Sequence, residues 1–141
     1  MALRSRAAGF AAVFFALGVM LSAVPAGASL DAVVAPRVVV PNMPESDCVT
    51  RAENALKTVM QNEVEAGEGS GVFVGVTRTD PSSPASAAAV IECHTVDAGG
   101  YSASFTCAVQ TPTNPEGAAA LCTRLVTAFG PAPAATSGGA L

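Results

Sequence analysis

The chain of 141 residues lacks tryptophan, has one tyrosine and one histidine, and carries only seven basic residues. Nucleic acids and anionic membrane surfaces are bound through clustered lysine and arginine side chains. The seven basic residues are scattered along the sequence, so we expect neither kind of partner. A single histidine, His94, also makes a closed transition-metal site hard to assemble, because such sites need several imidazole or thiolate ligands.

The four cysteines lack the close C-x-x-C spacing that is typical of zinc sites and redox catalysts. Successive cysteines are 45, 14 and 15 residues apart, at Cys48, Cys93, Cys107 and Cys122. In an exported chain, an even number of cysteines predicts disulfides. We therefore predict two structural disulfides and no cofactor.

Export is predicted from the first 28 residues. Arg4 and Arg6 precede an apolar run from roughly Ala7 to Val24, which is followed by Ala26-Gly27-Ala28. These are the three parts of a secretory signal peptide, and we expect cleavage after Ala28. An uncleaved membrane anchor is the alternative, because the run approaches the ~20 apolar residues of a spanning helix. The predicted localisation is secreted or periplasmic, without membrane attachment after cleavage.

Cleavage leaves 113 residues, the size of one small domain. Without the two arginines of the leader, five basic residues stand against eleven acidic ones, a formal charge of −6. Residues 29–46 contain three prolines, and we expect a flexible lead-in there in preference to a short edge strand. We expect residues 47–130 to form the single folded domain and residues 131–141 to be a disordered tail.

Periodicity predicts two helices and three strands in this domain. Residues 47–66 and 116–129 repeat apolar residues at the i, i+3, i+4 spacing of amphipathic helices. Residues 72–79 alternate as a strand does, and residues 87–109 predict a β-hairpin whose turn, at 97–100, contains two glycines. The order α-β-β-β-α predicts an α+β two-layer sandwich, with both helices on one face of a three-stranded antiparallel sheet.

The second arm of the hairpin alternates cleanly between apolar and small polar side chains. Its predicted buried face consists of Tyr101, Ala103, Phe105, Cys107 and Val109. A three-residue loop sets the register of the two arms by placing Asp97 opposite Tyr101.

That register predicts the disulfide partners. Cys93 then lies opposite Phe105 and diagonal to Cys107, and diagonal pairs are ~7 to 8 Å apart, beyond disulfide reach. We therefore expect each strand cysteine to bond to a helix cysteine. The predicted helix directions favour the pairs Cys48–Cys107 and Cys93–Cys122, whereas a register slip would allow Cys93–Cys107.

The outer face of the hairpin carries the candidate chemistry. In the same register His94 lies opposite Ser104, and Glu92 lies opposite Thr106. A hydroxyl, an imidazole and a carboxylate are the groups of a hydrolytic triad. The sequence marks no oxyanion hole, and a sheet face excludes little water, so we predict a polar ladder and no catalysis. Glu92, His94 and Ser104 remain candidate binding residues. His94 is also a candidate metal ligand, with Glu92 or Met43 as the second ligand.

We therefore predict that the protein binds an unknown protein or small-molecule partner, and that it is not an enzyme. Two further surfaces could carry it. One is the proline-containing loop 80–86, which resembles in composition the stiff segment that a protease inhibitor presents. The other is the uncovered sheet face, where Phe73, Val90 and Val96 would allow pairing with a second copy of the chain.

Overall fold

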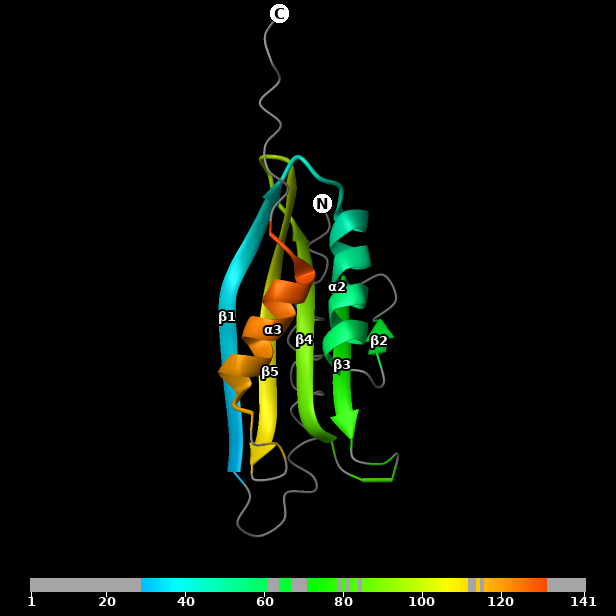
Figure 1. Cartoon of the computed structure of the whole chain (residues 1–141). Helices are drawn as coiled ribbons and strands as arrows, with labels where there is room; N and C mark the ends of the chain where they lie inside the picture. Colours follow the sequence, from blue (N-terminus) through cyan, green and yellow to red (C-terminus); the bar gives the residue numbers. More distant parts are fainter. Residues whose placement is uncertain are drawn as a thin grey trace, which may run out of the picture.

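The computed structural model describes residues 29–60, the backbone of 64–66, and residues 71–78, 80, 82, 83, 85–111, 114 and 116–131. An antiparallel sheet of five strands carries two helices on one face (Figure 1). The predicted α+β class is confirmed, but the described sheet has five strands instead of three. The expected signal peptide, residues 1–28, and residues 132–141 of the expected tail lie outside the described residues.

The sheet has the strand order β1-β5-β4-β3-β2. The strands are β1 (Ser29–Pro41), β2 (Val64–Ala66), β3 (Val72–Arg78), β4 (Ala85–Thr95) and β5 (Gly100–Thr111). The helices are α2 (Glu45–Met60) and α3 (Ala118–Phe129).

Strand β1 is the largest departure from the prediction, which treated residues 29–46 as a flexible lead-in. Ser29–Pro41 pairs antiparallel with β5 and forms one edge of the sheet. Prolines are tolerated there, because an edge strand or a bulge can lack an N–H without breaking the ladder. Pro36 lies in a bulge between Ala35 and Val38, and Pro41 ends the strand. The lead-in prediction is therefore wrong for residues 29–41.

The bulge also decides which side chains of β1 face the helices. Before it, odd-numbered residues of β1 pair with the helix-facing residues of β5; after it, even-numbered residues do. A bulge inserts one residue into one strand, so the alternation of faces shifts across it. As a result, Val34 and Val39 lie on the same face of the sheet, away from the helices.

The first helix is shorter than predicted, because α2 ends at Met60 and not at residue 66. Thr77 of β3 donates its hydroxyl hydrogen to the carbonyl oxygen of Met60 at 3.2 Å. This bond satisfies one of the carbonyls that a helix end leaves free. Val64–Ala66 then forms β2, which pairs with β3 at the other edge of the sheet.

The position of Phe73 in β3 corrects another prediction. Phe73 pairs with Ile91 on the helix-facing side and is 4% exposed, so it does not belong to the uncovered sheet face. Val72 and Val74 lie on the other side. Alternation had grouped these two valines correctly but did not reveal which side of β3 the helices cover.

The helix-facing side of β5 is buried as predicted, with no exposed surface on Tyr101, Ala103, Phe105, Cys107 or Val109. Phe129 of α3 packs edge-on against the Phe105 ring at a centroid distance of 5.4 Å. On β3, Gly75 lets α2 approach closely, because a Cβ there would lie 2.9 Å from side-chain carbons of Leu56 and Met60. The core is thus formed between the helices and one sheet face.

The hairpin register differs from the predicted one by one residue pair. Gly99, with φ 84°, takes the left-handed position of a three-residue loop, so the loop is 97–99 and begins one residue earlier than expected. His94 consequently lies opposite Ser102, and Glu92 lies opposite Ser104. The predicted pairs of His94 with Ser104 and of Glu92 with Thr106 are wrong.

Both disulfides join a helix to a strand, as expected, but the partners are exchanged. Cys48 of α2 bonds to Cys93 of β4, and Cys107 of β5 bonds to Cys122 of α3. The predicted pairs Cys48–Cys107 and Cys93–Cys122 are therefore wrong. The unpredicted strand β1 is the reason: α3 packs on β1 and β5, which places α2 mainly over β3 and β4.

The disulfides are expected to contribute much of the stability. They close loops with sequence separations of 45 and 15 residues, so chain entropy predicts losses of about 4 kcal/mol for Cys48→Ala/Cys93→Ala and about 3 kcal/mol for Cys107→Ala/Cys122→Ala. Urea denaturation followed by circular dichroism measures both. A double variant that unfolds at the same urea concentration as the parent would show that its disulfide is not structural.

Candidate functional site

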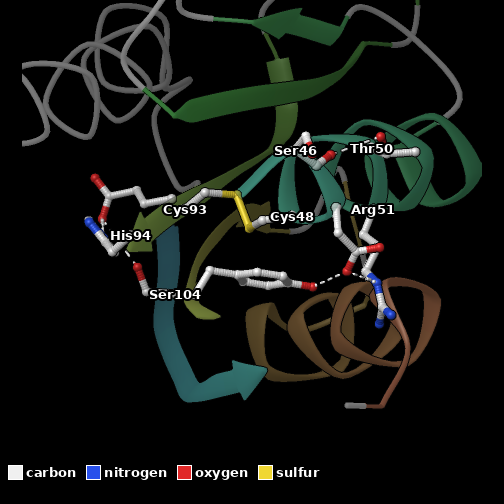
Figure 2. The surroundings of a disulfide bond; sticks show 10 residues. Ser46, Cys48, Thr50, Arg51, Cys93, His94 and Ser104 are labelled. Atoms are coloured by element: carbon white, nitrogen blue, oxygen red, sulfur yellow. Dashed lines mark hydrogen bonds and ion pairs between the residues drawn. A yellow bond between two sulfur atoms is a disulfide. The ribbon is translucent and has the colours of Figure 1, made fainter. Parts of the chain in front are cut away.

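The predicted polar residues meet on the face of β4 and β5 that the helices leave free. Ser104 donates a hydrogen bond to Oε2 of Glu92 at 3.3 Å, and Nε2 of His94 lies 3.8 Å from the same oxygen. Figure 2 shows His94 and Ser104 on the far side of the sheet from the Cys48–Cys93 disulfide. The structure therefore brings Glu92, His94 and Ser104 together.

Their order differs from that of a hydrolytic triad. In a triad the imidazole lies between the hydroxyl and the carboxylate, so that it can take the hydroxyl proton. Here the carboxylate of Glu92 lies between Ser104 and His94. The residue directly opposite His94 is Ser102, whose buried Oγ has no hydrogen-bond partner. The arrangement is that of a cross-strand polar ladder.

The described residues also offer no assembled metal site. No group of three or more histidine, cysteine, aspartate or glutamate side chains among them is placed to hold an ion. Met43, the other candidate ligand, packs against the hydrophobic core.

A second polar group, which sequence reasoning missed, joins three elements on the helix side. The Tyr101 hydroxyl donates to Oδ2 of Asp47 at 2.6 Å, and Nε of Arg51 lies 2.8 Å from the same oxygen. Arg51 also lies over the Phe129 ring, 5.8 Å from its centroid, and donates to the carbonyl oxygen of Pro131. Burial, and then the bond to Asp47, raises the pKa of Tyr101. This group therefore acts as a tie between α2, β5 and the end of α3.

The loop between β3 and β4 is held by its own side chains. Ser82 donates from its backbone N–H and from its hydroxyl to Oδ1 of Asp80, and Ser83 donates from both groups to the backbone oxygen of Asp80. The hydrogen bonds from Ser82 hold the pKa of Asp80 below its usual value. Arg78 donates to the carbonyl oxygen of Ser83 at 3.0 Å. The described part of loop 80–86 thus has a defined shape, although residues 81 and 84 lie outside the described residues.

An apolar groove of about 310 Å³ lies between β1 and α3. Its walls are residues 33–36 of β1 and one stripe of α3, namely Ala119, Cys122, Thr123, Val126 and Thr127. Its volume is at the small end of the ~300 to 1,000 Å³ range of ligand sites. Within the described sheet β1 has only β5 as a neighbour, so the groove borders an unpaired strand edge.

The hydroxyls of the two threonines that line this groove are already bonded within α3. The Thr123 hydroxyl donates to the carbonyl oxygen of Ala119 at 2.9 Å, and the Thr127 hydroxyl donates to that of Thr123 at 2.8 Å. A hydroxyl that donates its hydrogen to the preceding turn has no hydrogen left to donate to a ligand. The groove is therefore more apolar than its residue types indicate.

The sequence held one signal for the groove. Residues 116–129 contain only two charged side chains, Glu116 and Arg124, and these bond to each other. A surface helix is expected to carry charges opposite its buried stripe. Their scarcity on α3 leaves a second, weakly polar stripe beside the one that faces the core.

Neither a protein-family model nor a curated protein matches this chain. Its function is therefore argued from its own geometry. The two disulfides are typical of a chain that folds in an oxidising compartment, extracellular or periplasmic. In the described parts of the chain, no helix has the length and apolarity needed to cross a membrane.

The exposed apolar surface also differs from the expected one. Of the three residues expected on the uncovered sheet face, Phe73 faces the helices, and Val90 is buried together with Val72. The large hydrophobic side chains that are exposed in the described chain are Val34 and Val39, at 67% and 54%. Both valines belong to β1, so the exposed apolar surface of the described chain lies on this edge strand.

Burial of the Tyr101 phenol predicts how the stability of the protein depends on pH. Tyr101 is the one tyrosine in a chain without tryptophan, so ultraviolet absorbance follows its ionisation alone. We expect this ionisation well above pH 10, the ordinary pKa of tyrosine. Because the unfolded chain ionises first, the stabilisation is complete below pH 10 and is lost as the pH rises through the folded-state pKa.

The variant Tyr101→Phe is expected to remove this pH dependence. At neutral pH it should lower the free energy of unfolding by about 1.5 to 3 kcal/mol, because a hydrogen bond to a charged group is lost. A phenol that ionises at pH 10 in the folded protein would contradict the buried bond to Asp47.

Proposed function

We propose that this chain is an exported, disulfide-stabilised binding protein that takes an extended segment of another polypeptide along β1. The observation that supports it most is the apolar groove that borders the unpaired edge of β1. An edge strand offers a row of N–H and C=O groups to an added strand, and pockets beside it hold alternate side chains of that strand.

The distribution of protective features along β1 favours this use of its first half. Natural edge strands avoid unwanted pairing through prolines, charges and bulges. In β1 these devices gather after Ala35, with the bulge, Arg37 and both prolines. Residues 29–35 carry one charge, that of Asp31, and no proline. The groove lies beside the end of this less protected half.

The groove is also held in shape before any partner binds. The Cys107–Cys122 disulfide fixes α3 over β5, and Sγ of Cys122 lies 3.9 Å from the carbonyl oxygen of Val33. At the start of α3, Oδ2 of Asp31 accepts a hydrogen bond from the N–H of Ala118 at 2.8 Å. A preformed site loses less entropy on binding than one that must be ordered by its ligand.

The test uses two threonines with the same local bonding. Thr127 lines the groove, whereas Thr50 is exposed on α2, and each hydroxyl donates to the carbonyl four residues earlier. A peptide library is panned on the exported protein, immobilised sparsely so that copies cannot meet. Thr127→Arg should weaken the selected peptides by about tenfold or more, because it places a charge in the apolar groove, and Thr50→Arg should not.

Calorimetric titration of the selected peptides measures these affinities. Peptides that bind the Thr127→Arg variant as tightly as the parent would place the site elsewhere. A library that yields no peptide at all would argue against binding of extended segments.

The protease-inhibitor-like role of loop 80–86 is a second candidate, favoured by the hydrogen bonds that fix Asp80, Ser82 and Ser83. Inhibitory complexes form with little change in backbone shape, which a self-bonded loop suits. If this role holds, the protein slows at least one member of a panel of proteases, and Asp80→Ala weakens that inhibition. Unchanged rates across the panel would remove this candidate.

A further inference from the structure

We infer that the segment bound along β1 is a basic peptide that runs antiparallel to it, with two alternate apolar residues in the groove and a lysine or arginine opposite Asp31. This inference rests on the proposed function and adds the chemical class of the bound segment. It is argued from the hydrogen bonds of the sheet, from the direction of α3 and from the charge of Asp31.

The hydrogen bonds of the hairpin show toward which strand each residue of β5 points its backbone groups. The N–H of Val96 donates to the carbonyl oxygen of Gly100 at 3.3 Å. This pair continues the register of β4 and β5, so even-numbered residues of β5 bond to β4. In an antiparallel ladder the bonded side alternates from one residue to the next. Odd-numbered residues of β5 therefore bond to β1.

This alternation leaves three residues of β1 with free backbone groups before the bulge. Odd-numbered residues of β5 pair with odd-numbered residues of β1 up to Ala35, whose N–H and C=O groups therefore point toward β5. The groups that point away from β5 are those of Leu30, Ala32 and Val34. Pro36, in the bulge, has no N–H to continue this row. An added strand thus forms a short ladder with these three residues.

The same alternation decides which side chains of the bound strand reach the groove. Two residues that face each other without hydrogen bonds have Cα atoms ~4.5 Å apart, closer than the ~5.5 Å of a bonded pair. The residues opposite Asp31, Val33 and Ala35 form such close pairs on the helix-facing side. Val33 and Ala35 both line the apolar groove. We therefore expect apolar side chains opposite these two residues.

Helix α3 runs beside β1 in the same direction (Figure 1). The N–H of Ala118 donates to Oδ2 of Asp31 at 2.8 Å, and Sγ of Cys122 lies 3.9 Å from the carbonyl oxygen of Val33. Four helix residues rise ~6 Å and two strand residues rise ~6.6 Å, so the helix and the strand stay in step. Asp31 therefore lies at the end of the groove where α3 begins.

Asp31 is suited to bind a cation at this end of the groove. It is exposed, and among the described residues it forms no ion pair. The bond from Ala118 to Oδ2 holds the carboxylate in place, and Oδ1 remains free to accept from an ammonium or a guanidinium. Glu116, near the start of α3, is already paired with Arg124. The net charge of −4 also favours the approach of a basic segment.

Antiparallel pairing turns these positions into a sequence pattern. Along the bound segment, the residues opposite Ala35, Val33 and Asp31 follow one another in this order, each two positions after the last. The expected pattern is therefore apolar, any residue, apolar, any residue, basic.

The peptide library, panned in parallel on the parent and on two variants, tests this pattern. In Asp31→Asn the side-chain amide oxygen can still accept the Ala118 N–H, so the variant removes the charge and keeps the bond. Asp97→Asn removes the same charge from the exposed hairpin loop at the other end of β5. We expect the full pattern on the parent and on Asp97→Asn, whereas Asp31→Asn should keep the apolar residues of the pattern and lose the basic one.

Calorimetric titration of two synthetic peptides measures the charge preference. One capped peptide has valine at both apolar positions, lysine at the basic position and threonine elsewhere, and the other has glutamate in place of lysine. The parent should bind the lysine peptide about tenfold more tightly, because glutamate places two carboxylates together, and Asp31→Asn should reduce this ratio to within about twofold. High salt should also reduce it, since the ion pair is exposed.

Methylation of the peptide backbone tests the ladder independently of charge. An N-methyl group on the residue opposite Ala32 removes a hydrogen bond to the edge and should weaken binding by about tenfold. The N–H of the residue opposite Val33 points away from β1, so the same modification there should leave the affinity within about threefold. Thermal unfolding checks that Asp31→Asn stays folded, and the two peptide comparisons on the parent need no variant.

The outcomes separate this inference from the proposed function. Selected peptides that depend on Thr127 but lack the basic residue, or that bind Asp31→Asn as tightly as the parent, would overturn the inference and leave the proposed function standing. Equal weakening by both N-methyl groups would show a different register and also overturn the inference. A library without Thr127-dependent peptides would overturn both.

Discussion

The arrangement of the molecule depends on two covalent ties, each of which fixes one helix to one arm of the central hairpin. The apolar core alone is modest, because nine of the 26 buried apolar residues in the described chain are alanines. An alanine buries little apolar area compared with leucine or phenylalanine, and the hydrophobic contribution scales with that area. In small exported domains disulfides commonly supply the stability that such a core does not. The positions of α2 and α3 over the sheet therefore follow from where Cys93 and Cys107 lie on the hairpin.

The groove is a consequence of the same constraint. Cys107 lies on β5, next to the edge strand, so the disulfide to Cys122 holds α3 over the boundary between β5 and β1. A helix that is wider than the 4.7 to 4.9 Å strand spacing then extends beyond the last strand. The overhanging part of α3 lies beside the free edge of β1, where the described sheet has no further strand. The stripe of α3 that faces this space consists of small and apolar side chains. The polar ladder of Glu92, His94 and Ser104 lies on the opposite face, where no described helix shapes a concave site.

Local patterns in the sequence were sufficient to predict that the two helices and the hairpin exist and which face of β5 is buried, since these features depend on periodicities within one segment. They were insufficient for features that depend on which other strand or helix lies beside a segment. Pro36 and Pro41 made residues 29–41 look like a lead-in, because whether a proline breaks a strand depends on whether that strand lies at an edge. The disulfide partners were exchanged for the same reason, since α3 packs on β1. The predicted hairpin register was wrong by one residue pair, because Gly99 and Gly100 both allow positive φ and the sequence does not show which of them ends the loop.

The few charges of α3 mark one wall of the groove, but the sequence does not show that β1, which is far from α3 in the chain, forms the other wall. The groove and the small core are related through stability. A domain in which nine of the 26 described buried apolar residues are alanines keeps little stability in reserve, and association of the folded form adds stability through mass action. Exposed valines on a free edge lower solubility if they stay uncovered, yet they contribute binding energy once a second strand covers them. The features that make β1 a liability in an isolated chain are therefore those that favour its use as an interface.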